Sequence, residues 1–181
     1  MADSHPVLAR LRNARKSYGK LLALDDMDLQ SLTEVFGFGE ITGALDGSIR
    51  QLRLVDWSPQ AFVADLHTDS TWKGRQRISQ RAVQDLSSVG GNAGGLGNSL
   101  QAQALKLFDD FGYRQIGISC RLAEEVCEMD GLSSVANSFI IVQGSGLPRL
   151  SVVGFNRRVD WPTLVQRLVD VTQGDSKPVF E

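Results

Sequence analysis

The feature most suggestive of a binding site is a glycine-rich stretch at residues 90–99. It reads Gly90-Gly-Asn-Ala-Gly-Gly-Leu-Gly-Asn-Ser99 and lies between two segments with helical periodicity. Backbone N–H groups at the start of a helix form a natural site for a phosphate or another anion. The groups that would hold such a ligand are the backbone N–H groups of Gly95, Gly97 and Ser99 and the guanidinium groups of Arg77 and Arg81.

This stretch differs from the phosphate-binding P-loop, GxxxxGK[ST]. When Ser99 is aligned with the last residue of that motif, Asn98 occupies the lysine position and Asn92 the first glycine position. The stretch also follows a predicted helix, whereas a P-loop follows a strand. We therefore interpret residues 90–98 as an interhelical link. A small-ligand or nucleotide site at residues 90–99 remains the alternative.

The two arginines also belong to a second pattern. Arg77-x-x-x-Arg81 followed by Asp85-x-Ser87-x-x-Gly90 resembles the two halves of the signature of PilZ domains, which bind cyclic di-GMP. The resemblance implies that the guanidinium groups take phosphates and that the turn takes a base or ribose edge. In PilZ domains barrel strands separate the two halves, whereas here the halves nearly adjoin within a segment of helical pattern. The spacing favours a chance match.

Residues for enzymatic chemistry are scarce. His5 and His67 are the two histidines of the chain, and His67-Thr-Asp69-Ser70 contains the residue types of a catalytic triad. Triads assemble in space rather than at adjacent positions, and these histidines lack the cysteine pair of a typical zinc site. Asp109 and Asp110 are neighbours on a predicted helix and point in different directions. The sequence thus leans away from enzymatic activity and predicts no metal and no cofactor.

The composition is that of one globular domain. Of the 181 residues, 42% are hydrophobic and 22% charged, which is not the composition of a disordered chain. The formal net charge of −2 argues against a dedicated nucleic-acid binder. The apolar runs are too short to span a membrane. Cys120 and Cys127 form no CxxC motif, so we expect reduced thiols in a cytoplasmic protein.

The elements follow from hydrophobic periodicity and from capping and turn residues. Ser4, Ser99 and Asp160 are helix caps, Asp46-Gly47 indicates a hairpin turn, and Ser58-Pro59 indicates the start of a helix. The predicted helices are residues 5–24, 28–36, 59–67, 75–88, 100–112 and 161–174, and the predicted strands are 40–45, 48–56, 116–122, 137–143 and 149–155. For residues 59–67 an edge strand is the alternative.

The apolar faces of these elements predict one core. We expect it to contain Leu107, Phe108, Phe111, Ile116, Ile118, Ile140, Val142, Val152, Leu164 and Leu168. Trp57, Trp72 and Trp161 are expected to be core or interface anchors rather than platforms for stacked bases.

This element order predicts an α+β domain. A hairpin and a three-strand meander would form one antiparallel sheet of about five strands, covered by helices in two layers. We expect a single domain over residues 1–174 and a frayed tail at 175–181. The order across residues 27–173 resembles the roadblock and longin type of profilin-like scaffold, many of whose members dimerise and bind small GTPases or other proteins.

Two functions follow from these observations. The first is a non-enzymatic protein-interaction, adaptor or regulatory domain that forms a homodimer. The alternative is a small-ligand or nucleotide-binding protein or enzyme that uses the loop at residues 90–99 and the nearby arginines.

Overall fold

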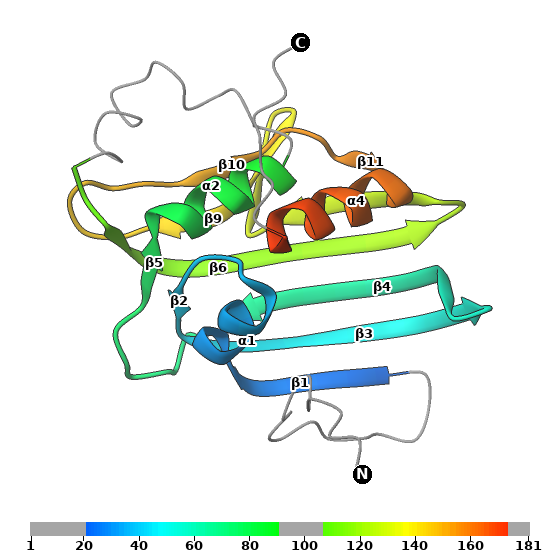
Figure 1. Cartoon of the computed structure of the whole chain (residues 1–181), viewed down its shortest axis with the longest axis horizontal. Helices are drawn as coiled ribbons and strands as arrows, with labels where there is room; N and C mark the ends of the chain where they lie inside the picture. Colours follow the sequence, from blue (N-terminus) through cyan, green and yellow to red (C-terminus); the bar gives the residue numbers. More distant parts are fainter. Residues whose placement is uncertain (1–20, 91–106, 174–181) are drawn as a thin grey trace, which may run out of the picture.

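A computed structural model describes residues 21–90 and 107–173 of the chain. These residues form eleven β-strands and three α-helices, with antiparallel pairing throughout (Figure 1). The prediction of an α+β fold with an antiparallel sheet is confirmed. The expected number of about five strands is wrong, because the sheet is larger and dominates the fold.

The main sheet is built around one long strand, β6 (Asp110–Ala123). The second half of β6 pairs on one edge with β4 and on the other with β7. From edge to edge the order is β1 (Leu21–Asp28), β3 (Ala44–Val55), β4 (Ser58–Thr68), β6, β7 (Val126–Gly131) and β11 (Arg158–Asp160). The lower part of Figure 1 shows β1, β3 and β4 side by side below β6.

The first half of β6 belongs to two further groups of strands. On one edge it pairs with β5 (Arg77–Ser79), which pairs in turn with β2 (Ile41–Thr42). On the other edge it pairs with β9 (Ser138–Gly144). β9 also pairs with β8 (Ser133–Val135) and β10 (Val152–Gly154). β6 therefore connects all parts of the sheet.

Each helix begins at a side-chain cap. Asp28 caps α1 (Leu29–Phe36), Ser79 caps α2 (Gln80–Val89) and Asp160 caps α4 (Trp161–Thr172), each accepting a backbone N–H of the first turn. The predicted helix at 28–36 and the predicted cap at Asp160 are confirmed. Figure 1 shows α2 in front of β9 and β10 and α4 beside α2, above β6, and α2 packs against both α4 and β10.

The two faces of the main sheet differ in polarity, because cross-strand partners in an antiparallel ladder share a face. One face, here called the core face, carries Ile49, Phe62, Ala64, Leu66, Ile118, Cys120, Leu122, Cys127 and Met129. The opposite face, here called the polar face, carries Arg50, Asp65, Ser119, Arg121, Glu128 and Asp130. α4 lies on the core face, where the ring of Trp161 contacts that of Phe62.

Several predicted elements are wrong. Residues 21–24, expected at the end of the helix 5–24, begin strand β1; the rest of that helix lies outside the described residues. Residues 59–67 lie in a strand, as the alternative proposed, although β4 is an interior strand between β3 and β6. Asp46-Gly47 lies within β3 and forms no turn.

The part of the predicted helix 100–112 that the structure describes is not helical, because β6 begins at Asp110. Phe111 is buried, on a strand instead of a helix. Ile116, Val142, Val152 and Leu164 are buried as predicted, while Ile118 and Ile140 are partly buried. Leu107, Phe108 and Leu168 are exposed, so their assignment to the core is wrong. Leu107 and Phe108 precede the strand that carries Phe111 into the core.

Candidate functional site

The two arginines of the predicted ligand site are engaged by carboxylates. Arg77, on β5, forms an ion pair with Asp110 at the start of β6, and its Nη2 also donates to the Asp110 carbonyl at 3.4 Å. Arg81, in the first turn of α2, places Nε 3.7 Å from Oδ2 of Asp85. Gly95, Gly97 and Ser99 lie outside the described residues. In the part of the chain that the structure describes, these arginines stabilise local structure and do not converge on a common point.

Asp85 is the buried member of the second pair. Its side chain is 6% exposed, and no hydrogen-bond donor among the described residues reaches its Oδ2. Burial raises the pKa of the Asp85 carboxyl above its ordinary value, and the charge of Arg81 opposes this shift. At 3.7 Å the Arg81 guanidinium is too distant for a hydrogen bond. We interpret Arg81 as a partial counter-charge for a buried carboxyl group.

The residue types of the suspected triad do not assemble. Nδ1 of His67 lies 3.2 Å from Oδ1 of Asp65, on the exposed polar face. Asp69 instead accepts hydrogen bonds from the backbone and hydroxyl of Thr71, and these bonds lower the pKa of its carboxyl. The side chains of His67 and Asp69 therefore have separate hydrogen-bond partners.

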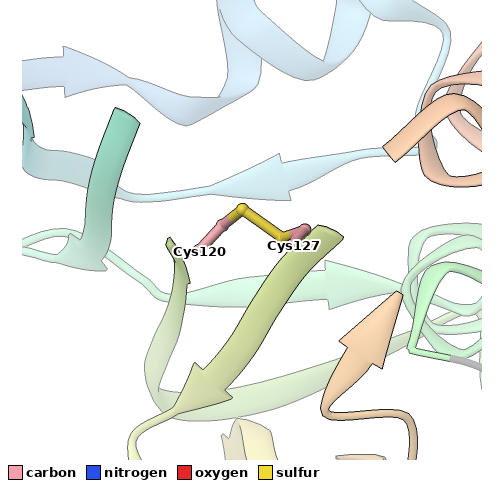
Figure 2. The surroundings of a disulfide bond; sticks show 2 residues. All are labelled: Cys120 and Cys127. Carbon is pink, nitrogen blue, oxygen red and sulfur yellow. A yellow bond between two sulfur atoms is a disulfide. The ribbon is translucent and has the colours of Figure 1, made fainter. Parts of the chain in front are cut away.

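Cys120 and Cys127 are joined by a disulfide bond. Figure 2 shows the two side chains meeting between neighbouring strands, and their Cα atoms are 5.6 Å apart. Both cysteines lie on the core face, and Cys127 is completely buried. The prediction of reduced thiols is wrong, because β6 and β7 pair as a hairpin and bring the two residues to adjacent strands.

A group of exposed large apolar side chains lies at one end of the sheet, on both of its faces, since Leu21 faces Arg50 and Leu22 faces Ile49. The pairing of β1 with β3 begins where Leu21 faces Arg50. The β3–β4 hairpin continues past this point to Val55 and Ser58, so its end extends beyond the first described residue of β1. Trp57, in the hairpin turn, is 92% exposed. We call this surface the apolar tip patch; it consists of the exposed side chains of Leu21, Leu22, Leu52, Leu54, Val55 and Trp57.

The turn that carries Trp57 has an unusual backbone. Asp56 and Trp57 have φ angles of 47° and 62°, both in the left-handed region. Two positive φ angles are typical of the type I′ hairpin turn, which favours Asn and Gly. The β6–β7 turn has the same character, with φ angles of 50° and 61° at Glu124 and Glu125. Because β4 and β6 are antiparallel neighbours that pair Phe62 with Leu122, both turns lie at the same end of the sheet.

The sequence singled out only one member of the apolar tip patch, Trp57, as a possible interface anchor. The other members are apolar residues in or beside strands, and such residues are ordinarily assigned to a core. Their exposure depends on how far the hairpin extends beyond its neighbours, which local sequence does not encode.

The described residues contain no cluster of three or more His, Cys, Asp or Glu side chains placed to hold a metal ion. Among the helices in residues 21–90 and 107–173, none has the length and apolar character needed to cross a membrane. Comparison with known proteins identifies no matching family model, no similar curated protein and no similar solved structure, and so gives no support to the roadblock and longin resemblance.

Proposed function

We propose that this chain is a non-enzymatic interaction domain that binds a protein partner through the apolar tip patch. The observation that carries the proposal is the exposure of six large apolar side chains at one end of the sheet, with Trp57 at its extremity. Large apolar side chains that are exposed together at one end of a folded domain are a common mark of an interaction site.

Trp57 is suited to anchor such an interface. Tryptophan is enriched among the residues that contribute most to binding, and burying one at the centre of an interface often contributes about 2 kcal/mol or more.

The first partner to test is a second copy of the same chain, in line with the homodimer expected from the sequence. Pairing along the whole of β1 is an unfavourable way to form it. The second half of β1 carries Asp25, Asp26 and Asp28, and a shared edge would bring like charges close together. A dimer is therefore better formed through the apolar tip patch than through the full length of β1.

The compartment is also part of the proposal. Structural disulfides persist in oxidising compartments and are rare in the cytoplasm. The Cys120–Cys127 bond therefore favours an oxidising compartment over the cytoplasmic location expected from the sequence. The alternative ligand site at residues 90–99 loses the support of its two arginines, because Arg77 and Arg81 are paired with Asp110 and Asp85.

The test is sedimentation velocity of the purified chain over a wide range of concentrations. We expect concentration-dependent association of the wild type and its loss in the double variant Leu54→Ser, Trp57→Ser. Leu147→Ser is the matched control, because Leu147 is 97% exposed and lies outside the patch. Equal association of the double variant and the wild type would rule out the patch as the dimer interface.

A wild type that stays monomeric at every concentration would exclude self-association and leave a different protein as the partner. In that case a photo-crosslinking residue at position 57, compared with one at position 147, tests the patch in cells. Crosslinks formed from both positions alike would contradict the proposed site.

A further inference from the structure

The polar face of the main sheet contains a shallow basin of about 540 Å³. Its floor is formed by β3, β4, β6 and β7, and residues that precede and begin β11 form its wall. The charged side chains that line it are those of Arg50, Asp65, Arg121, Glu128, Asp130, Arg157 and Arg158. A volume of this size is within the range of sites for small molecules, roughly 300–1,000 Å³.

Three of the arginines lie in one row across the sheet. Arg50 on β3 faces Val63 on β4, and Val63 faces Arg121 on β6. Arg121 faces Glu128 on β7, which in turn faces Arg158 on β11. Arg50 and Arg121 are thus two strands apart, a separation of roughly 9.5 Å between their backbones. Val63 lies between them on β4 and lines the basin together with both arginines.

Most of the acidic groups of the basin already have partners. Asp130 accepts hydrogen bonds from Ser134 and lies 3.5 Å from Nη1 of Arg157. Asp65 lies beside Nδ1 of His67. Glu128 lies directly opposite both Arg121 and Arg158 in the ladder, and its carboxylate forms no ion pair within 4.0 Å with either of them.

Arg50 and Arg121 are left without a carboxylate within 4.0 Å among the described residues. Two guanidinium groups that face one open space repel each other, and an anion between them removes that repulsion. Each can donate two parallel hydrogen bonds to a phosphate or a carboxylate.

We propose that this basin is a binding site for a small organic anion, whose phosphate or carboxylate group lies between Arg50 and Arg121. The acidic side chains on the floor argue against an extended polyanion such as a nucleic acid, because they would repel a continuous row of phosphates. The ligand is therefore a compact molecule with one anionic group. The site adjoins the apolar tip patch, because Arg50 faces Leu21 in the ladder of β1 and β3.

The experiment is an NMR or calorimetric titration of the full chain with inorganic phosphate, glycerol 3-phosphate and acetate, each at constant ionic strength maintained with chloride. We expect saturable binding of at least one of these anions by the wild type. Tighter binding of glycerol 3-phosphate than of phosphate identifies an organic phosphate as the ligand, and the strongest binding of acetate identifies a carboxylate.

The double variant Arg50→Gln, Arg121→Gln should bind at least about tenfold more weakly, because each removes charge-assisted hydrogen bonds. The matched control is Arg53→Gln, Arg149→Gln, which removes the same charge from exposed arginines outside the basin. Binding that is unsaturable in the wild type, or that falls equally in the two double variants, would overturn the proposal. Circular dichroism of all three proteins shows whether a loss of binding comes from loss of folding.

Discussion

The ring of Phe62 lies edge-on against the ring of Trp161, with 5.3 Å between the ring centroids and an interplanar angle of 76°. Phe62 belongs to the β3–β4 hairpin, and Trp161 is the first residue of α4. The contact therefore connects the hairpin that carries the apolar tip patch to the helix near the C-terminal end of the described chain.

Replacing Phe62 by leucine should weaken this connection. Such an aromatic pair contributes about 0.5–1.5 kcal/mol beyond its buried area, so we expect Phe62→Leu to lower the free energy of unfolding by about 1 kcal/mol. Urea denaturation measures the loss, and near-ultraviolet circular dichroism reports the altered surroundings of Trp161. An unchanged aromatic signal would contradict the observed contact.

Removing the charge of Asp85 should stabilise the protein at neutral pH. Because burial raises the pKa of Asp85 in the folded state, the folded chain holds this proton more tightly than the unfolded chain does. Stability therefore falls as the pH rises from the ordinary value of 3.8 through the folded-state pKa. Asp85→Asn should be more stable than the wild type above this window and should lose that advantage below it.

The measurement for Asp85 is the difference in unfolding free energy between variant and wild type from pH 3 to pH 8. Asp109→Asn, which removes a charge from an exposed carboxyl group, is the control and should show a smaller difference. A wild type that is more stable than Asp85→Asn at neutral pH would show that the Arg81 ion pair outweighs the burial of the charge.

A methyl group at position 39 should destabilise the chain. Gly39 has a φ of +71°, and a Cβ there would lie 2.5 Å from the backbone nitrogen of Ala82 in α2. Gly39→Ala combines this clash with a strained backbone, so we expect a loss well above the roughly 1 kcal/mol of the backbone alone. Gly146→Ala is the control, since Gly146 has a φ of +78° and a methyl group there would meet nothing within 4 Å. Thermal denaturation of both variants separates the steric clash from the backbone strain. An equal fall in melting temperature for the two variants would exclude the clash.

Reducing the disulfide should lower stability without unfolding the protein. Cys120 and Cys127 are separated by 7 positions. A disulfide that closes so short a loop restricts the unfolded chain and thereby raises the free energy of unfolding by about 2 kcal/mol. Urea denaturation with and without a reductant measures the difference, and Cys120→Ala should be insensitive to the reductant. Alkylation of both cysteines in the native, unreduced protein would show that the bond is absent.

The sequence predicted best those elements that local signals define. The cap at Asp160 gives α4 its start, and the alternation of Ile116, Ile118, Cys120 and Leu122 marks the second half of β6. These signals involve residues that are close in sequence, so they can be recognised without knowledge of the tertiary fold.

The errors arose where tertiary pairing overrides a local signal. Ser58-Pro59 is a typical start of a helix, but β4 is hydrogen-bonded to β3 on one edge and to β6 on the other. Pro59 is tolerated because it lies at the beginning of the strand. Asp46-Gly47 resembles a turn, but Gly47 lies in strand β3 where the neighbouring strand β4 passes too close for a side chain. A Cβ there would lie 2.5 Å from the Asp65 carbonyl oxygen.

The candidate sites were less predictable than the fold. Arg77 and Arg81 were visible in the sequence, and the i,i+4 spacing of Arg81 and Asp85 suits a pair on one helix face, but the pairing of Arg77 with Asp110 depends on the tertiary fold. The row that includes Arg50 and Arg121 depends on the register of β3, β4 and β6, since a shift of one residue would place either arginine on the core face. No local pattern in the sequence specifies that register.

The two hairpin turns at one end of the sheet have a consequence for how this protein tolerates sequence change. Asn-Gly would adopt the backbone of Asp56-Trp57 or of Glu124-Glu125 at lower energy than the residues present. Substituting Asn-Gly at either turn should therefore raise the melting temperature. The natural chain thus retains Trp57, Glu124 and Glu125 at positions where the backbone favours Asn or Gly. A library screened for thermal stability alone should replace these residues first, whereas one screened for partner binding should keep Trp57.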